Sequence, residues 1–399
     1  MWPIARRLLQ PLQAFLETET SSAILLLVAT MVALVWANAF GHAYPRFWGT
    51  ELTIGIGRWS MTHDLRDWVS DGLMTLFFLL AGLEIKREVV TGELRERRAA
   101  LLPVAAAVGG MIVPAAIYLA FTAGTDAASG FGAAMPTDVV FALAVLALAR
   151  RLPAGLRALL LALAIVDDLG SVVVVAFTYP ETVNLAPLLV AIALLGAYGA
   201  LWRIRVRFAV IYAALAIAVW VAVSEAGISP TIAGVALGLL TPAVEARRPD
   251  ADREEARVSP LAGLEALLLP WVTFVVVPLF ALAYAGIELS RGTVANVVTS
   301  RLGLGILAAR LLGKPLGIGL AVVLAAWLGA TLPAGVRPRH VLGMAAAAGI
   351  PFTVSLYIAR SSLPAPLVST ATVAILLAAA VCGLVGFAIL RSRATSRTL

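Results

Sequence analysis

Long apolar segments alternate with short polar segments along almost the whole chain. A helix needs about 20 apolar residues to cross a membrane, whereas a barrel strand needs about 10 residues of strictly alternating polarity. The segments are long, unbroken and rich in Ala, Leu, Val and Gly, so they predict helices. We expect an all-α polytopic membrane protein, a single domain over residues 1–399. Its twelve predicted transmembrane helices lie at about 22–41, 65–90, 100–123, 130–149, 156–179, 186–202, 208–224, 227–242, 260–285, 302–328, 340–360 and 367–391.

The positions of Lys and Arg predict the orientation of these spans. With both termini cytoplasmic, most of the 30 Lys and Arg residues fall on the cytoplasmic side, including the clusters at 86–98, 203–207 and 247–257. Cytoplasmic loops of membrane proteins carry this excess of basic residues. No convincing small-residue cleavage site accompanies the first apolar segment, so we expect it to be retained as a helix.

Composition supports a membrane protein and excludes other classes. The chain is 61% hydrophobic and 13% charged, against about 45–50% and 25% in soluble domains. The net charge of +7 comes from short basic clusters that flank apolar segments, so we expect a lipid bilayer and no nucleic acid as partner. The single cysteine, Cys382, excludes a disulfide framework.

Two polar segments between spans differ from the others. Residues 42–64 are long and aromatic, and residues 53–57 (TIGIG) alternate in polarity as a short strand does. A small β-hairpin on the membrane surface that serves subunit contact is one interpretation, and a loop without function is the other. Residues 244–258 mix Arg, Glu and Asp, which is typical of a solvated linker.

Two adjacent carboxyl groups, Asp167 and Asp168, lie near the middle of the fifth predicted span. Ionisable residues within spans cost about 2.5–3.5 kcal/mol on insertion scales and usually mark a pathway for ions. Neighbouring helix positions point about 100° apart, so the pair requires a polar cavity. It would titrate as a coupled unit and suits binding of protons or one hard cation. Alternatively, the pair caps a broken helix or makes interhelical hydrogen bonds.

Two predicted spans contain residues that interrupt a helix. Pro136-Thr137-Asp138 lies in the fourth span, and residues 349–353 (GIPFT) lie in the eleventh, with Ser355 following. Proline removes a backbone donor, and unwound backbone at membrane depth is tolerated where it lines a cavity. Interrupted helices in comparable positions of two halves indicate a transporter's binding site. Asp138 would either bind the ion or balance the positive ends of half-helices.

Further charged residues lie in or near the spans. Lys314 would pair with an aspartate near the membrane centre, or extend its ammonium to the interface from a helix end; Arg310, four residues earlier, has no evident role. Another cluster lies at the cytoplasmic side, with Glu84 and Glu88 on one helix face. The alternative for that cluster is an ordinary solvated helix end. The cluster comprises Glu84, Arg87, Glu88 and Glu265.

Five segments between residues 65 and 360 together resemble the NhaA-type Na+/H+ antiporters. They are residues 77–88 (FFLLAGLEIKRE), 136–138 (PTD), 164–170 (AIVDDLG), 312–317 (LGKPLG) and 349–353 (GIPFT), in the order and spacing of the family. Members of this family are among the transporters from which the rule on interrupted helices was drawn, so the two arguments are not independent.

The resemblance implies twelve helices with two inverted three-helix repeats, whose interrupted fourth and eleventh spans cross near the ion site. It implies that Asp168 is the main ligand of the transported Na+ or Li+, and that Asp167 pairs with Lys314 when the cation is absent. Thr137 would line the site, and Asp138 and Lys314 would compensate charge at the crossing. The interruptions would involve Pro136, Gly349, Pro351 and Thr353.

The resemblance also implies features away from that crossing. The cluster of Glu84, Arg87, Glu88 and Glu265 would sense pH at the cytoplasmic side, and residues 42–64 would form a homodimer contact. The protein would be a multi-pass protein of the bacterial inner membrane. Three positions depart from the family: Ser229 stands where a histidine is common, Pro351 replaces a small glycine, and Tyr284 replaces an asparagine. The first departure bears on the form of the pH response.

The expected function is pH-dependent, electrogenic exchange of cytoplasmic Na+ or Li+ for external H+, by alternating access and without a cofactor. The chain is therefore expected not to be an enzyme. An intramembrane aspartyl protease would also use two aspartates, but its Gly-x-Gly-Asp motif is absent. A passive channel would need repeated rings of carbonyls or carboxylates, and no such repeat occurs.

Overall fold

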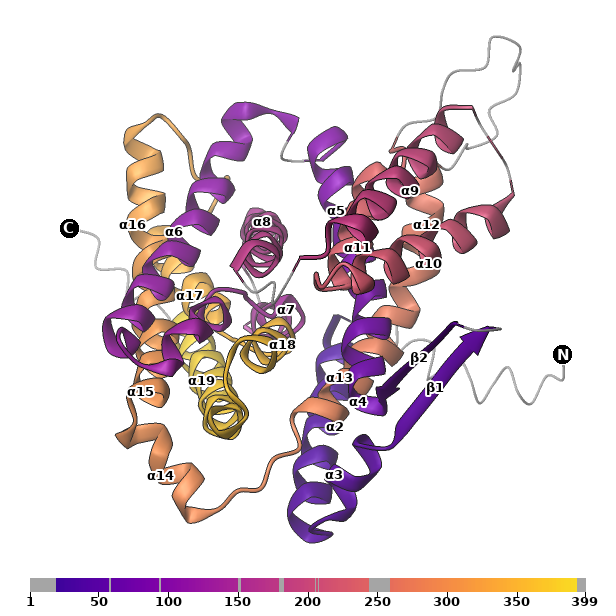
Figure 1. Ribbon diagram of the computed structural model, residues 1–399. Coiled ribbons are helices and arrows are strands. Elements are labelled where there is room, and N and C mark those ends of the chain that lie inside the picture. Colours follow the sequence, from indigo (N-terminus) through magenta and orange to yellow (C-terminus); the bar gives the residue numbers. More distant parts are fainter. Residues whose placement is uncertain are drawn as a thin grey trace, which may run out of the picture. The chain divides into compact units, whose positions relative to one another are not determined.

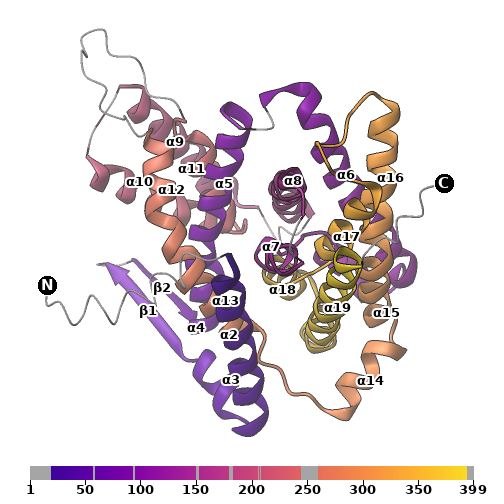
Figure 2. The ribbon, with the colours of Figure 1, turned by 180° about the vertical axis from the view of Figure 1, so that it is seen from behind.

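The computed structural model describes residues 19–56, 59–92, 95–149, 152–178, 183–204, 206, 208–243 and 259–392. The chain forms two compact units, each assembled from separate stretches of sequence (Figures 1 and 2). Unit 1 contains Met1–Ala39, Leu101–Asp168 and Tyr284–Leu399, and unit 2 contains Phe40–Ala100 and Leu169–Ala283. The predicted linker 244–258, the chain termini and many of the basic clusters lie outside the described residues.

Unit 1 is entirely helical in its described part. Its elements are α2 (Glu19–Ala39), α6 (Arg97–Thr122, from Leu101 on), the 3₁₀ helix η3 (Asp126–Ala134), α7 (Val139–Leu148), α8 (Ala154–Thr178, as far as Asp168), α14 (Arg291–Thr299), α15 (Arg301–Ala308), the π-helical segment η5 (Ala309–Gly313), α16 (Lys314–Trp327), α17 (Pro338–Ala348), α18 (Thr353–Ser362) and α19 (Ala365–Arg391).

Two helix pairs in unit 1 are bent at short non-helical breaks. The pair η3 and α7 is bent by 47°, and the pair α17 and α18 by 46°. The first break contains Pro136, which has no backbone N–H for a helix, and the second contains Pro351 directly after Gly349 and Ile350. The spans expected at 130–149 and 340–360 are therefore each two shorter helices.

The core of unit 1 packs small and branched apolar residues around these breaks. Helix α17 lies against α19, and α7 also contacts both of them. Figure 1 shows α17, α18 and α19 together at the yellow end of the colour scale. Ala345, Ala347 and Ala348 of α17 are fully buried, as is Leu146 of α7. Because alanine side chains let backbones approach closely, the polar breaks are brought into contact without large intervening side chains.

Unit 2 combines helices with one small sheet. Its elements are α3 (Ala43–Trp48), β1 (Glu51–Ile56), β2 (Trp59–Asp64), α4 (Leu65–Asp67), the π-helical segment η1 (Trp68–Leu73), α5 (Met74–Val90), the remainder of α8, α9 (Leu185–Arg203), α10 (Ala209–Glu225), α11 (Thr231–Leu240), α12 (Pro260–Trp271), the π-helical segment η4 (Val272–Val276) and α13 (Val277–Tyr284, as far as Ala283).

Glycines allow α5 and α11 to pack closely within unit 2. A Cβ added at Gly82 would lie 2.6 Å from the carbonyl oxygen of Val235, and one added at Gly238 would lie 2.6 Å from that of Leu79. Neither helix can move away without losing its buried contacts, so both positions require glycine. Small residues at helix contacts are the usual means of close packing in membranes, where the hydrophobic effect between helices is absent.

Two of the π-helical segments precede a proline. Segment η5 ends two residues before Pro315, and η4 ends two residues before Pro278. A proline lacks the N–H that bonds to the carbonyl four residues earlier and crowds that carbonyl, so the helix widens locally. These segments were not expected, because the apolar pattern of a π-helical turn is the same as that of its α-helical surroundings.

The segment 42–64 contains both strand and helix. Strands β1 and β2 pair antiparallel, with Thr53 opposite Thr62, and their hydroxyl oxygens lie 2.8 Å apart. The structure adds helix α3 before the strands, and helix α14 in the polar stretch 291–299, neither of which the apolar pattern predicted. The Ser290 side chain caps α14 by accepting from the Thr293 N–H at 3.0 Å, a local signal independent of hydrophobicity.

Seven helices of the described residues are long and apolar enough to cross a membrane, and nine qualify if each bent pair is one span. Helices α10 and α11 are apolar but shorter. The structure therefore agrees with an all-α membrane protein. The number of twelve spans remains a prediction.

The packing of α5 against α11 predicts the effect of a single methyl group. Gly82→Ala should lower the free energy of unfolding by about 1–3 kcal/mol through overpacking, and the apparent Tm in detergent by about 5 °C. Gly196→Ala in α9 is the matched control, because a Cβ there meets nothing within 4 Å. The measurement is the fraction of folded protein that remains after heating; an unchanged Tm in Gly82→Ala would contradict the packing.

Candidate functional site

All buried charged side chains of the described residues lie in unit 1. Isolated charges in an apolar interior are costly, so such groups must pair or receive hydrogen bonds. These five residues therefore define the candidate site: Asp138, Asp167, Asp168, Arg310 and Lys314.

An ion pair between Lys314 and Asp167 lies at the centre of this site. The ammonium of Lys314 is 2.7 Å from Asp167 Oδ2, and both side chains are fully buried. The same ammonium donates a hydrogen bond to the carbonyl oxygen of Met135, in the first break. Lys314 therefore does not extend to the surface, and the alternative of a helix-end lysine is wrong. Removal of either partner from such a buried pair strongly destabilises the folded protein, because the remaining charge is left without a partner.

Thr137 connects the first break to both the carboxylate and the second interrupted helix. Its hydroxyl lies 2.7 Å from Asp167 Oδ2 and 2.8 Å from the carbonyl oxygen of Ala348 at the end of α17. A hydroxyl has one proton, so it donates to only one of these oxygens at a time. Thr137 can thus change its partner when the state of Asp167 changes.

Asp138 lies at the start of two helices and joins the two breaks. Its backbone N–H donates to Ile350 O at 2.9 Å, and its carboxylate accepts from the N–H of Phe141 in the first turn of α7. The carboxylate also accepts from the N–H and hydroxyl of Thr353, which begins α18. A negative group at helix N-termini is stabilised by their partial positive charge. This geometry favours charge balance over cation binding for Asp138.

Asp168 and the second oxygen of Asp167 complete the acidic side of the site. Asp168 is 8% exposed, and no hydrogen-bond partner of Asp167 Oδ1 occurs among the described residues. The two residues are neighbours in α8, which is continuous through this point. Carboxylate and hydroxyl oxygens are suitable ligands for a hard cation. The arrangement can hold either a cation or protons.

The residues of the second break are buried and tightly surrounded. A Cβ at Gly349 would lie 2.9 Å from Cys382 Sγ and 3.0 Å from Arg310 O, so only glycine fits. Pro351 follows in the break, and the Phe352 ring meets Phe141 edge-to-face at 5.2 Å. Pro136 and the residues of the second break are all buried, so the backbone of both breaks lies inside unit 1.

Arg310 is the member of this site to which sequence reasoning assigned no role. Its side chain is fully buried, and its guanidinium donates to the carbonyl oxygens of Ala133 and Pro136 and to the hydroxyl of Ser355. The available signal was its presence within an apolar span four residues before Lys314. That signal identifies an unusual residue, but it does not reveal partners that are mostly backbone atoms.

A second cluster lies in unit 2, where α5 meets α12. The Arg87 guanidinium pairs with Glu265 through one nitrogen, while its other terminal nitrogen lies 3.6 Å from Glu88 Oε1. Glu84, one turn before Glu88, is partly buried. The Arg87 side chain is 41% exposed, so this cluster borders solvent, unlike the site in unit 1.

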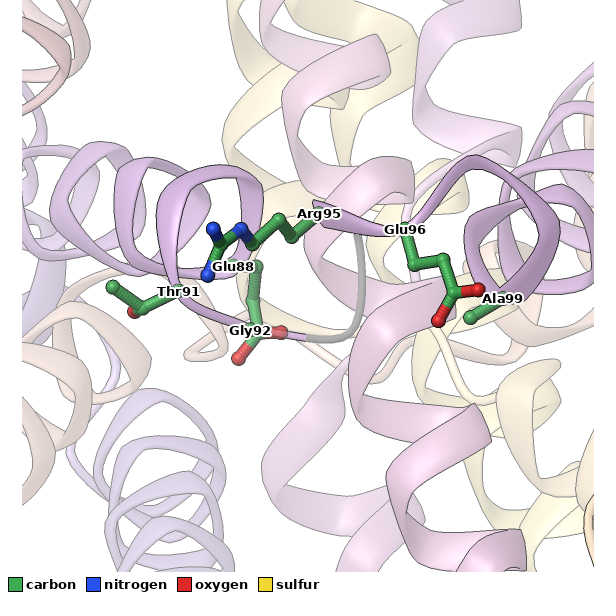
Figure 3. Close-up of a pocket in the computed structure, with 6 residues that line it drawn as sticks. All are labelled: Glu88, Thr91, Gly92, Arg95, Glu96 and Ala99. Carbon is green, nitrogen blue, oxygen red and sulfur yellow. The ribbon is translucent and has the colours of Figure 1, made fainter.

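An open pocket of about 680 Å³ adjoins Glu88 at the C-terminal end of α5. Figure 3 shows Glu88 and Arg95 along one side of it and Glu96 on the other. Glu88, at this end of the acidic cluster, therefore lines an open pocket. The remaining lining residues are Thr91, Gly92 and Ala99.

Comparison with known proteins identifies relatives along the whole chain. The family model "Na+/H+ antiporter 1" matches residues 13–390. The chain is 42% identical to Na(+)/H(+) antiporter NhaA 2 of Sorangium cellulosum, over 97% of this chain and 90% of that protein. It is 40% identical to Na(+)/H(+) antiporter NhaA 1 of Klebsiella pneumoniae, over 97% and 98%. A relative of 41% identity, NhaA 1 of Salinispora arenicola, is longer, and the chain covers 61% of it. The chain belongs to the NhaA family of Na+/H+ antiporters.

Proposed function

We propose that this protein extrudes Na+ or Li+ from the cytoplasm in exchange for external protons, by alternating access to the site in unit 1. The observation that carries this proposal is the buried ion pair of Lys314 and Asp167, with Asp168 beside it on α8. A cation can occupy Asp167 Oδ2 only when the Lys314 ammonium leaves that oxygen. The relatives' names supply the ions concerned.

In the proposed cycle, one cation and two protons compete for the site. Na+ enters from the cytoplasm, binds Asp168 and Asp167, and displaces the ammonium of Lys314. Asp168 and Lys314 each give up a proton as the cation binds. After the site opens outward, Na+ leaves, and external protons return to Asp168 and Lys314, which pairs again with Asp167.

This proposed cycle is electrogenic because two protons enter for each Na+ that leaves. One net positive charge then moves inward, and a charge that crosses 100 mV gains about 2.3 kcal/mol. A membrane potential negative inside would therefore drive Na+ outward. No cofactor takes part, since the site residues carry all the proton and cation exchange.

Around this site we propose twelve spans with both termini cytoplasmic, in the bacterial inner membrane. Two inverted three-helix repeats would each contain one bent helix pair. The broken helices η3/α7 and α17/α18 support this arrangement, because their breaks contact each other at Asp138 and Ile350. Small movements at such a crossing would change access to Asp167 and Asp168 from the two sides.

We further propose that the protein works as a homodimer that is joined through the β1–β2 hairpin. Leu52 and Ile54 alternate along β1 and are 43% and 48% exposed. A two-stranded sheet has unpaired edges and is barely stable alone, so an apolar face on an exposed hairpin suits contact with another copy.

The cluster of Glu84, Arg87, Glu88 and Glu265 would make exchange pH-dependent. It carries three carboxylates around one guanidinium and borders a pocket open to solvent. Protonation would alter the Arg87–Glu265 pair between α5 and α12, and thereby the packing of these helices. Ser229 stands at the position where the family resemblance implies a histidine, so the response would rest on carboxylates.

The site assignment predicts that Asp168→Asn abolishes exchange. Loss of an anionic ligand should lower Na+-dependent dequenching of a pH dye in everted vesicles by about 100-fold or more. Asp126→Asn is the matched control, because Asp126 is exposed at the start of η3. Equal activity of Asp168→Asn and wild type, at equal amounts in the membrane, would refute the assignment.

The acidic cluster predicts a shifted pH profile in Glu265→Gln. With one negative charge less the cluster binds protons less strongly, so the activation midpoint should move toward acid by about half a pH unit. The maximal rate at alkaline pH should stay unchanged, since the site in unit 1 is intact. Glu288→Gln serves as control because Glu288 is exposed and belongs to unit 1. A coincident profile for Glu265→Gln and wild type would exclude Glu265 from pH sensing.

A further inference from the structure

Arg310 is a second buried cation in the site that the proposed exchange cycle does not use. It lies in the π-helical segment η5, directly before Lys314 begins α16. Both side chains are fully buried. A guanidinium in an apolar interior is costly unless its donors are bonded, so its partners indicate what it does.

Those partners belong to both bent helix pairs. One terminal nitrogen donates to Pro136 O at 2.6 Å, and the other donates to Ala133 O at 2.7 Å. The second nitrogen also donates to the hydroxyl of Ser355 in α18, at 2.6 Å. Arg310 thus bonds the C-terminal end of η3 and the first break to the second half of the other pair.

Carbonyl groups at a helix end need such donors when no water is present. The last carbonyls of a helix have no partner within it and carry partial negative charge, which a cation stabilises. A planar guanidinium has several donors in fixed directions and can bond several carbonyls at once. The ammonium of Lys314 reaches Met135 O only, besides Asp167.

The bond to Pro136 matters because of the residue that follows. The Pro136 carbonyl belongs to the peptide bond that leads into Thr137, and the Thr137 hydroxyl lies 2.7 Å from Asp167 Oδ2. A donor that fixes this peptide therefore fixes the place of the hydroxyl at the carboxylate. Lys314 cannot serve in this way throughout a cycle in which it leaves Asp167.

We propose that Arg310 is a positioning residue that holds Thr137 at the ion site while Lys314 exchanges with the cation. Arg310 stabilises the carbonyl end of the first interrupted helix permanently. Lys314 is thereby left to respond to the occupant of Asp167. Arg310 thus keeps the backbone in place, and Lys314 competes with Na+. This inference rests on the proposed function of Asp167 and Asp168.

The test is a double-mutant cycle between Arg310 and Thr137 on the KM for Na+. Arg310→Met should raise KM by about tenfold, as loss of a group that orients a ligand does, with a smaller effect on the maximal rate. Thr137→Val should raise it similarly, and the double variant should match the larger single effect, because both remove the same contact. Arg310→Lys should restore part of the loss by retaining the charge.

The control for the substitution itself is Arg301→Met, at an exposed position that opens α15, the helix directly before η5, and an unchanged KM is expected. If Arg310→Met does not accumulate in the membrane, Ser355→Ala and Arg310→Lys take its place, and each is combined with Thr137→Val in the same measurement of KM. Loss of one hydrogen bond in Ser355→Ala should raise KM by about threefold.

Two results would overturn the inference. One is a normal KM in Arg310→Met, and the other is a double variant whose KM rises by the product of the two single effects, as for independent sites. The measurement on wild type distinguishes a failure of this inference from a failure of the proposed function. If wild type shows no Na+-dependent proton flux, the proposed function fails. If wild type is active and Arg310→Met is normal, the positioning role alone fails.

Discussion

The constraint on which the structure depends is that every charge buried in unit 1 must find a partner away from water. Lys314 meets Asp167, Asp138 meets the N–H groups that open α7 and α18, and Arg310 meets carbonyl oxygens at the end of η3. A continuous helix has no free N–H or carbonyl groups in its middle to offer. The interruptions of the two bent helix pairs therefore supply free N–H and carbonyl groups, and these groups stabilise the buried charges.

The same constraint underlies the proposed exchange of a cation and protons at one place. The buried charged groups, three carboxylates and two cations, carry a net charge of −1 when all are ionised. With Asp168 protonated and Lys314 charged, the five groups are neutral. When Na+ binds and both protons leave in the proposed cycle, the groups and the cation together carry one negative charge, so exchange changes the charge of the site by one unit. In the proposed cycle Na+ also displaces the ammonium from Asp167 Oδ2, which couples cation binding to Lys314. In this proposal Arg310 stays bonded to the carbonyl oxygens of Ala133 and Pro136. The backbone from Met135 to Thr137 therefore keeps its position when Lys314 is displaced.

Much of this fold and part of the site follow from the sequence, for identifiable reasons. Apolar segments of membrane length predicted the helices, and Pro136 and the sequence of residues 349–353 predicted the two breaks, because those residues leave backbone groups unbonded. The proximity of Lys314 to Asp167 followed from resemblance to the family, not from spacing along the chain. Helix α14 was missed because its polar sequence gives no apolar signal, although Ser290 provides a cap.

The role of Arg310 could not be predicted because its partners are mainly backbone carbonyls far away in sequence. Every residue has a backbone carbonyl, so the side chains of Ala133 and Pro136 give no indication that these residues bind Arg310. The π-helical segment that contains Arg310 also leaves no mark in the apolar pattern. Only the contact between the two bent pairs brings these groups together, and that contact is a property of tertiary packing.

The proposed competition of Na+ and the Lys314 ammonium for Asp167 is tested most directly by the number of protons released when Na+ binds. Purified protein in weak buffer, just below the pH of half-maximal exchange, receives Na+ while a pH dye reports proton release. Wild type should release about two protons per bound Na+, because both Asp168 and Lys314 give up one. Lys314→Gln should release about one. Equal release from the two proteins would show that Lys314 takes no part in the exchange and would contradict this account.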